Sequence, residues 1–213
     1  MKNLFTNQMR EQLSASRAIA TVTIDKVEDT QPLAEALLSG GVRVVEVTLR
    51  TPLALQAMRS IAKNYPELLV MAGTVITPQQ VKQVQDAGAV CAVAPGMNRR
   101  VIEAAFSAGL PFAPGVTTPS EIEAALEYNC DLLKYFPAES MGGIRYLKNM
   151  QAPYAHLGLK FIPLGGLNSK NAGDYLKEDC ILAVGGSWIA NADAIRSGDW
   201  NGIEQRAAAL MKI

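Results

Sequence analysis

The chain has 213 residues, of which 49% are hydrophobic and 19% charged, and 20 basic side chains balance 20 acidic ones to a net charge of +0. This length predicts a single domain over residues 1–213, and the apolar fraction is large enough for a substantial core, which argues against intrinsic disorder. The balanced charge argues against a nucleic-acid partner, because binding to phosphates usually requires a basic excess.

Cysteine, histidine and the first residues indicate the compartment and the absence of a metal. Cys91, Cys130 and Cys180 are widely spaced within apolar runs, so we interpret them as buried thiols of a reducing compartment rather than as a disulfide framework. His156 is the only histidine, and no cysteine pair has ligand spacing, so no metal site is expected. The polar start lacks a signal sequence, and no apolar run reaches the ~18 residues of a membrane span. We therefore expect a cytoplasmic protein without a membrane partner.

Eight short runs rich in Val, Ile and Leu recur along the chain and are predicted to be strands. They are too continuously apolar for strands with one wet face, which favours a buried parallel sheet. The runs cover residues 18–24, 43–49, 68–74, 90–95, 110–116, 131–137, 159–166 and 181–186.

Segments with helical periodicity lie between these runs. Thr77 precedes Pro78 at one predicted helix start, and Thr118 with Glu121 forms a capping box at another. The predicted helices cover residues 27–38, 52–63, 78–87, 98–108, 118–128, 143–150, 168–177 and 201–211.

Eight strands that alternate with helices, without a linker between them, predict an α/β fold of the (β/α)8 TIM-barrel type. An amphipathic helix over Leu4–Leu13 precedes the first strand, and we expect it to cap the N-terminal mouth of the barrel. A doubly wound open sheet has the same alternation and is the alternative. The absence of a glycine-rich fingerprint after the first strand favours the barrel.

Lys134 is the residue that the core pattern explains least, because it interrupts the apolar sixth run. An unpaired buried ammonium is costly, so this lysine is in an ion pair, reaches solvent, or is a Schiff-base nucleophile. We favour the nucleophile, because barrel enzymes place catalytic groups at the carboxyl ends of their strands. Lys160 is the rival, but it starts its strand and so belongs to the opposite face.

Glu46 interrupts the second run in the same way. It is either half of a buried ion pair or a general acid–base beside the amine of Lys134. The second and sixth strands are both even-numbered, so their inward residues share a layer of the barrel interior. A carboxylate favours the charged amine, whereas apolar neighbours favour the neutral one, and the sequence leaves the balance open.

Other candidate site residues follow the predicted strands. Arg50 offers a two-pronged donor for a carboxylate, and Thr74 offers a hydroxyl to the same group. Gly165-Gly166 and Gly185-Gly186-Ser187 end the seventh and eighth strands, where barrels often bind phosphate through backbone N–H groups and a following helix N-terminus. Each also has an ordinary interpretation, as a surface arginine, a helix cap or a tight turn.

Taken together, six segments resemble the KDPG aldolase family, also called 4-hydroxy-2-oxoglutarate aldolase, from about residue 18 to the C-terminus. The segments are GGVRVVEVTLRT (40–51), AGTVITPQQ (72–80), PGVTTPSE (114–121), KYFPAE (134–139), GG (165–166) and GGSW (185–188). The resemblance implies a class I aldolase. It would cleave 2-dehydro-3-deoxy-6-phosphogluconate to pyruvate and glyceraldehyde 3-phosphate, and/or 4-hydroxy-2-oxoglutarate to pyruvate and glyoxylate. It also implies a homotrimer of the Entner–Doudoroff pathway that needs no cofactor or metal.

The resemblance assigns a role to individual residues. Lys134 would be the Schiff-base lysine and Glu46 the proton shuttle, while Arg50 and Thr74 would bind the carboxylate of the pyruvyl group. The remaining implied site residues are Pro95 and Phe136, which would line the site, and Gly165, Gly166, Gly186 and Ser187, which would hold the phosphate.

The sequence departs from the family pattern at Leu164, where members commonly carry a threonine before the glycine pair. Ser140 and Met141 also differ from the residues associated with the family. A site discriminates hydroxyl configurations only if it presents polar partners, so the C4 preference and the need for phosphate stay open. The alternatives are a C4-epimeric 2-keto-3-deoxy-phosphogalactonate aldolase, a phosphosugar isomerase or epimerase, and a non-catalytic phosphosugar-binding barrel.

Overall fold

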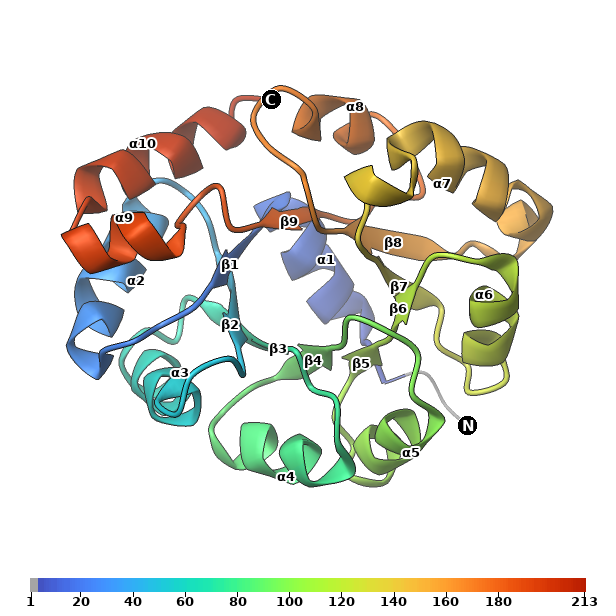
Figure 1. The fold of residues 1–213 in the computed structure, drawn as a ribbon, viewed down its shortest axis with the longest axis horizontal. Helices are drawn as coiled ribbons and strands as arrows, with labels where there is room; N and C mark the ends of the chain where they lie inside the picture. Colours follow the sequence, from blue (N-terminus) through green and yellow to red (C-terminus); the bar gives the residue numbers. More distant parts are fainter. Residues whose placement is uncertain (1–3) are drawn as a thin grey trace.

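A computed structural model describes residues 4–213 as an α/β structure in which short strands lie centrally and helices surround them (Figure 1). Every strand pairing is parallel. The strands are β1 (Ala18–Val22), β2 (Val44–Thr48), β3 (Leu69–Gly73), β4 (Cys91–Val93), β5 (Phe112–Ala113), β6 (Gly115–Val116), β7 (Leu132–Tyr135), β8 (Lys160–Pro163) and β9 (Val184–Gly186).

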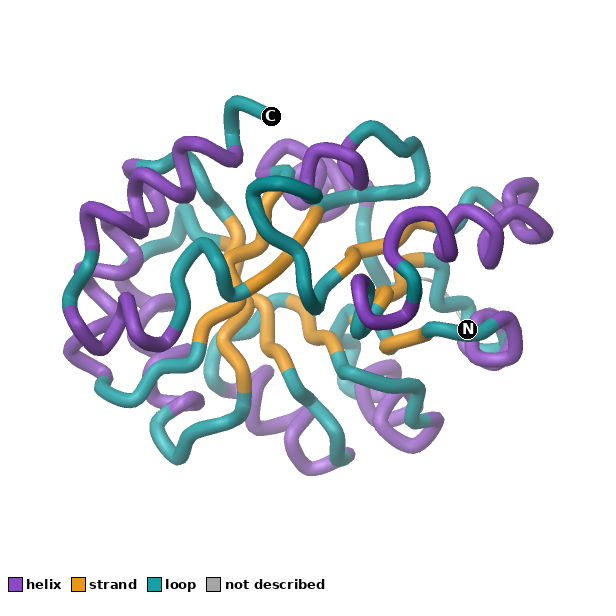
Figure 2. Tube along the Cα trace, turned by 45° about the horizontal axis from the view of Figure 1, so that its top comes forward, coloured by secondary structure: helices purple, strands orange, loops and turns teal. Residues whose placement is uncertain are grey.

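The helices surround the strands in the ribbon of Figure 1 and in the tube of Figure 2, except α1, which lies behind the strands in Figure 1. The α-helices are α1 (Asn7–Ser16), α2 (Thr30–Ser39), α3 (Ala54–Asn64), α4 (Pro78–Asp86), α5 (Arg99–Ser107), α6 (Pro119–Leu126), α7 (Gly143–Gln151), α8 (Ala172–Leu176), α9 (Ala192–Ser197) and α10 (Trp200–Leu210). Short 3-10 turns occupy Val27–Asp29, Glu139–Met141 and Ala152–Leu157.

The strands form two sheets, with the order β5-β4-β3-β2-β1-β9 in one and β6-β7-β8 in the other. Each of the eight predicted runs contains a strand, but the fifth is divided into β5 and β6 by Pro114, which has no N–H to donate. A single parallel bridge, Phe161 to Ile181, joins β8 to the segment before β9. The order runs from β5 to β1 without a reversal, whereas the alternative doubly wound sheet requires one.

Alternation along the strands explains why the runs are continuously apolar. The side chains of Ile19, Val44 and Met71 belong to one buried cluster, together with Leu132 and Ile162 of the smaller sheet. Their neighbours in the chain, such as Ala20, Val45, Val70 and Leu133, belong to a second cluster that includes the buried faces of the helices. Both faces of each strand are therefore buried, as parallel sheets require.

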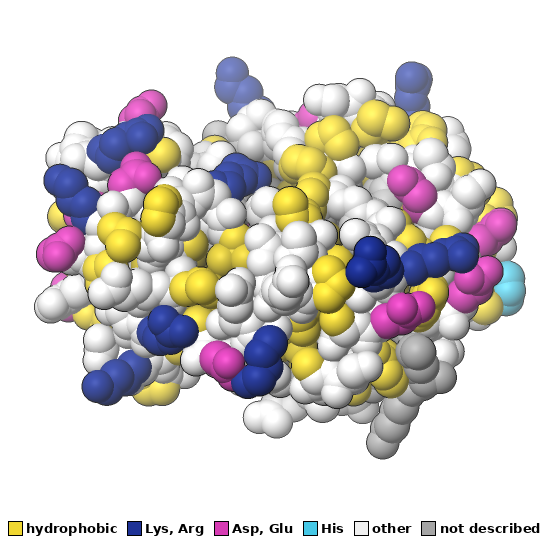
Figure 3. All heavy atoms as spheres, turned by 60° about the horizontal axis from the view of Figure 1, so that its bottom comes forward, with side chains coloured by type: hydrophobic (Ala, Val, Ile, Leu, Met, Phe, Trp, Pro, Cys, Tyr) yellow, Lys and Arg dark blue, Asp and Glu magenta, His cyan; other side chains and the backbone are white. Residues whose placement is uncertain are grey.

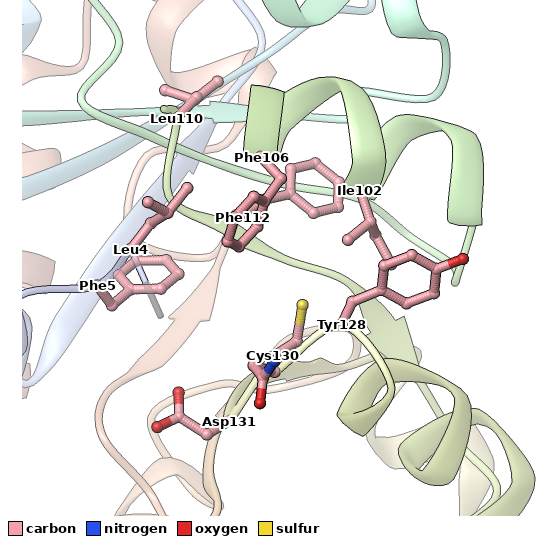
Figure 4. Close-up of a pocket in the computed structure, with 10 residues that line it drawn as sticks. Leu4, Phe5, Ile102, Phe106, Leu110, Phe112, Tyr128, Cys130 and Asp131 are labelled. Atoms are coloured by element: carbon pink, nitrogen blue, oxygen red, sulfur yellow. The ribbon is translucent and has the colours of Figure 1, made fainter. Parts of the chain in front are cut away.

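The N-terminal segment packs against the inner cluster. Leu13 of α1 is 0% exposed, and Leu13 and Phe5 lie in the same cluster as Ile19. An ion pair between Arg10 and Asp131 ties α1 to the start of β7. Figure 4 shows the side chains of Leu4 and Phe5 beside Phe112 and above the Cys130–Asp131 segment.

The helix expected over Leu4–Leu13 is displaced in the structure to Asn7–Ser16. Thr6 accepts a hydrogen bond from the Met9 N–H and so fixes the first turn. Arg17 adopts a left-handed conformation, with φ of 54°, and ends the helix. These capping residues place the helix about three residues later than the apolar periodicity indicated.

The other helices follow the predicted ranges with some changes. The capping boxes of Thr77 with Gln80 and Thr118 with Glu121 start α4 and α6. The helix predicted over 168–177 is reduced to α8, and α9 was not predicted. The Asn191 side chain accepts from the Ala194 N–H at the start of α9, so an asparagine cap was the available signal.

Two of the three cysteines are less buried than the sequence analysis expected. Cys91 is fully buried, but Cys130 and Cys180 are half-buried, and all three are free thiols. Burial raises the pKa of Cys91 well above its usual value, with a further contribution from the nearby Glu46 carboxylate. Burial likewise raises the pKa of Cys130 to about 12, so both thiols are protonated near neutral pH.

The surface carries both signs of charge. Basic and acidic side chains are interspersed on the face shown in Figure 3, which matches the net charge of +0. Among residues 4–213, no helix has both the length and the apolar character needed to cross a bilayer.

Leu13→Ala should lower the free energy of unfolding by about 2–5 kcal/mol, because it leaves a cavity between α1 and the inner cluster. Urea unfolding monitored by circular dichroism measures this. Glu11→Ala, on an exposed position of the same helix, is the matched control and should cost less than about 0.5 kcal/mol. Equal stability of the two variants would show that α1 does not pack as described.

Candidate active site

The inward-facing positions bring Lys134 and Glu46 together. Lys134 is on the same side of β7 as Leu132, and Glu46 is on the same side of β2 as Val44. Leu132 and Val44 both belong to the buried cluster that contains Ile19 and Met71, which is the inner cluster. The two polar residues each lie two positions further along their strands, towards the carboxyl ends. The prediction that the second and sixth apolar runs, which form β2 and β7, bring these two side chains within reach of each other is confirmed.

Lys134 and Glu46 form a buried ion pair. The Lys134 Nζ donates to Glu46 Oε1 at 3.0 Å, and the two residues are 4% and 1% exposed. The Phe136 ring centroid is 5.2 Å from the same Nζ, which adds an attraction between the cation and the aromatic face. Such a pair offers an amine and a proton acceptor in direct contact, shielded from bulk water.

Gly73, the last residue of β3, makes the room that Glu46 needs. A Cβ at Gly73 would lie 2.2 Å from Glu46 Oε1 and 2.7 Å from its Cγ. In the sheet register Gly73 is paired with Thr48, two positions beyond Glu46 on β2. A residue larger than glycine would displace the carboxylate, so Gly73 is part of the site although the sequence analysis did not assign it a role.

Thr21 of β1 is a second residue that the sequence analysis missed. It pairs with Glu46 in the sheet register and donates its hydroxyl to Glu46 Oε2 at 3.0 Å. The available signal was a hydroxyl at an inward position of the first apolar run, next to the strand that carries Glu46. A lone threonine in a strand is common, so this signal is weak without the register.

A cavity of ≈ 240 Å³ opens beside the ion pair at the carboxyl ends of the strands. Seven of the ten predicted site residues line it, together with three residues that were not predicted as site residues. The predicted residues are Arg50, Lys134, Phe136, Gly165, Gly166, Gly186 and Ser187, and the additions are Thr21, Leu164 and Leu167. Glu46 contacts this cavity through Lys134 and Thr21.

Arg50 is exposed at the cavity and positioned to bind an anion. Its guanidinium forms no ion pair within residues 4–213, so its donors are available to a carboxylate. The neighbouring Thr51 is different, because its hydroxyl donates to the Ile24 carbonyl at 2.7 Å and is used within the protein.

The glycine turns of the cavity lining are places where a side chain does not fit, and Gly186 of β9 is the register partner of Ala20, which adjoins Thr21 on β1. Gly165 and Gly166 have φ of +94° and +85°, which side chains rarely adopt. A Cβ on Gly186 would lie 2.1 Å from the Trp188 ring. The expected helix N-terminus is displaced, because α8 and α9 begin at Ala172 and Ala192 rather than directly after these turns.

Thr74 and Pro95 are predicted site residues that do not line the cavity. Thr74 directly follows β3 and has φ of 62°, a strained value for a threonine. The Pro95 carbonyl packs against Gly115, where a Cβ would lie 2.3 Å from it, and Gly115 pairs with Lys134. Lys160 is half-buried at the start of β8 and donates to the Asp179 carbonyl, and it is absent from the lining of this cavity.

Buried phenols hold the loop that supports the glycine turn. Tyr135 donates to the Met141 carbonyl at 3.2 Å, and burial raises its pKa to about 12. Tyr175 donates to Glu139 at 2.5 Å, and burial, followed by that hydrogen bond, raises its pKa further. Both phenols are therefore protonated donors near neutral pH, and Glu139 in turn packs against Gly166.

A sequence profile described as KDPG and KHG aldolase matches residues 9–206. The chain belongs to the KDPG and KHG aldolase family. It is 40% identical over 195 residues to the KHG/KDPG aldolase of Escherichia coli (strain K12), covering 92% of this chain and 91% of that one.

Two further relatives support the assignment. The chain is 41% identical over 203 residues to the 2-dehydro-3-deoxy-phosphogluconate aldolase of Dickeya dadantii (strain 3937), covering 95% of this chain and 94% of the relative. It is 40% identical to KDPG aldolase from Legionella pneumophila, a crystal structure with pyruvate captured at low pH as a covalent carbinolamine. That comparison has a TM-score of 0.90 and covers 94% of this chain and 97% of the other.

Gly73→Ala should displace the Glu46 carboxylate by about 1 Å, the shift that restores an ordinary contact distance. A crystal structure of the variant measures the separation between Lys134 Nζ and Glu46 Oε1, which should exceed 3.0 Å. Gly96→Ala is the matched control, because nothing lies within 4 Å of a Cβ there. An unmoved carboxylate in Gly73→Ala would contradict the described fit.

Proposed function

We propose that this member of the family is a class I aldolase that cleaves 2-dehydro-3-deoxy-6-phosphogluconate, 4-hydroxy-2-oxoglutarate or both, and releases pyruvate. The observation that carries the proposal is the contact between Lys134 Nζ and Glu46 Oε1, at 3.0 Å, at the edge of a cavity that Arg50 also lines. Covalent catalysis by lysine requires the amine to lose a proton before it attacks, and this contact places a carboxylate where it can accept that proton.

The reaction begins when Glu46 accepts a proton from the Lys134 ammonium. The neutral amine attacks the C2 ketone to give a carbinolamine, and the protonated Glu46 returns its proton to the carbinolamine hydroxyl, which leaves as water and gives a protonated imine. Glu46 then takes the proton of the C4 hydroxyl, the C3–C4 bond breaks, and its electrons move to the imine nitrogen. The aldehyde leaves, a proton returns to C3 of the enamine, and water hydrolyses the imine to release pyruvate.

The substrate carboxylate binds Arg50 in this proposal, and Thr74 assists from the end of β3. A phosphate, where the substrate has one, lies against the N–H groups of Gly165, Gly166 and Gly186 and the hydroxyl of Ser187. Phe136 forms the wall beside the imine, and Pro95 packs against Gly115, the register partner of Lys134. No step needs a metal or an organic cofactor.

The position of Lys134 favours an aldolase over the other candidate functions. A phosphosugar isomerase or a phosphosugar-binding barrel has a use for the glycine turns but none for a buried amine paired with a carboxylate. A buried ion pair is expensive to maintain, so its presence at the cavity edge supports a catalytic use.

We also propose that residues 1–213 form one (β/α)8 barrel capped by α1. Support comes from the bridge between Phe161 and Ile181, which links β8 to the β9 segment, and from the single residue, Pro114, that separates β5 from β6. We further propose, on the basis of family membership, that the protein is a cytoplasmic homotrimer.

Analytical ultracentrifugation tests the trimer and should give about three times the 22.8 kDa chain mass. A mass of one chain would contradict it.

Sodium borohydride with pyruvate should trap a reduced pyruvyl adduct on Lys134, because the imine forms there. Peptide mass spectrometry locates the adduct. Lys134→Ala should form none and lose at least about 10³-fold in kcat while staying folded.

Lys160→Ala is the control for that experiment, because Lys160 starts β8 and so lies at the opposite end of the strands from the cavity. It should keep both the adduct and the activity. An adduct that persists in Lys134→Ala, or none in the folded native protein, would rule out the proposed mechanism.

Leu164 fills the inner wall of the cavity and is 3% exposed, so that wall presents no hydroxyl near the reacting carbons. Leu164→Thr should change the ratio of kcat/KM for the two C4 epimers by about tenfold, the effect of one added polar partner. Assays with both epimers, phosphorylated and not, measure the ratio and decide between the gluconate and galactonate substrates. An unchanged ratio would show that Leu164 does not contact C4.

A further inference from the structure

Thr21 lies between Glu46 and the cavity. Its side chain lines the cavity, whereas Glu46 itself does not. The same hydroxyl donates to Glu46 Oε2 at 3.0 Å, so one group touches both the space that substrate would occupy and the buried carboxylate.

The two oxygens of Glu46 have different partners. Oε1 accepts from Lys134 Nζ at 3.0 Å, and Oε2 accepts from Thr21 Oγ1 at 3.0 Å. The carboxylate occupies the space that a side chain on Gly73 would fill, since a Cβ there would lie 2.2 Å from Oε1. The Thr21 hydroxyl therefore links Oε2 to the cavity by a hydrogen bond.

A hydroxyl has one proton to donate and lone pairs that accept another. While Thr21 donates to Glu46, its lone pairs remain able to accept a hydrogen bond from a hydroxyl or water in the cavity. These are the requirements for passing a proton through a group that is itself unchanged at the end.

We propose that Thr21 relays protons between the oxygen atoms of the bound substrate and Glu46, an inference that rests on the aldolase function proposed above. When a substrate hydroxyl loses its proton, the O–H bond of the substrate breaks and a new O–H bond forms on Thr21 Oγ1. The original Thr21 proton moves to Glu46 Oε2 in the same event. One proton has then moved from substrate to carboxylate, and no oxidant or reductant is involved.

Thr23 provides a matched comparison on the same strand. It lies two positions beyond Thr21 and therefore faces the same side, but its hydroxyl is 3.1 Å from Thr48 Oγ1 rather than near Glu46. A loss of hydroxyl at Thr23 tests the effect of removing a threonine from β1 without touching the proposed relay.

The experiment compares Thr21→Val, Thr21→Ser and Thr23→Val with the native protein, using racemic 4-hydroxy-2-oxoglutarate and coupled detection of pyruvate. Thr21→Val keeps the shape of the side chain and removes the hydroxyl, so kcat should fall about 10- to 100-fold. KM should stay within about twofold, because the relay acts on the chemical steps rather than on uniform binding. Thr21→Ser should recover most of the activity, and Thr23→Val should retain it.

Borohydride trapping with pyruvate in each protein distinguishes a failure of the proposed aldolase function from a failure of the proposed Thr21 relay. Absence of an adduct in the folded native protein would reject the aldolase itself. With the adduct present, a Thr21→Val enzyme that matches native kcat would reject the relay. Equal impairment in Thr21→Ser and Thr21→Val would also reject it, because it would show that side-chain packing rather than the hydroxyl is responsible.

Discussion

The contact between Lys134 and Glu46 is the interaction on which the rest of the site depends. Two ions lose most of their hydration when they are buried, and removal of one partner from such a pair typically costs about 3–5 kcal/mol. The fold meets this cost by supplying the partner, a second hydrogen bond from Thr21, and the space beside Gly73. The arrangement leaves an amine at the edge of a cavity with a proton acceptor in contact.

The parallel strands create this arrangement through their alternation. Inward positions near the start of the strands carry Ile19, Val44 and Leu132, which form an apolar floor together with Leu13 of α1. Two residues further along, the same strands carry Thr21, Glu46 and Lys134. The inward side chains therefore change from apolar to polar over two residues of each strand. The apolar positions stabilise the fold, and the polar positions are those proposed to take part in the reaction.

Much of the fold and the central pair was predictable from the sequence. Periodicity located all eight apolar runs, because burial of both strand faces leaves a strong signal. Lys134 and Glu46 were found because a charge inside such a run has few structural explanations. The division of the fifth strand at Pro114 and the short helix α9 were missed, since they depend on single residues, a missing N–H and an asparagine cap.

The remaining site residues required coordinates. Thr21 and Gly73 act on Glu46 through register and close approach, and neither residue type is unusual in a strand. Thr74 was assigned from its place at a strand end and Pro95 by resemblance alone, and neither is part of the cavity lining in the structure. The sequence pattern does not show which residues of different strands lie side by side, and that is why Thr21 and Gly73 were not found.

The most direct test of the account is a crystal structure of the protein frozen after brief exposure to pyruvate. The account predicts continuous density between Lys134 Nζ and C2 of pyruvate, with the pyruvate carboxylate beside Arg50 and Glu46 still held by Thr21. Pyruvate bound without a covalent bond, with Lys134 still paired to Glu46, or pyruvate bound elsewhere, would contradict it.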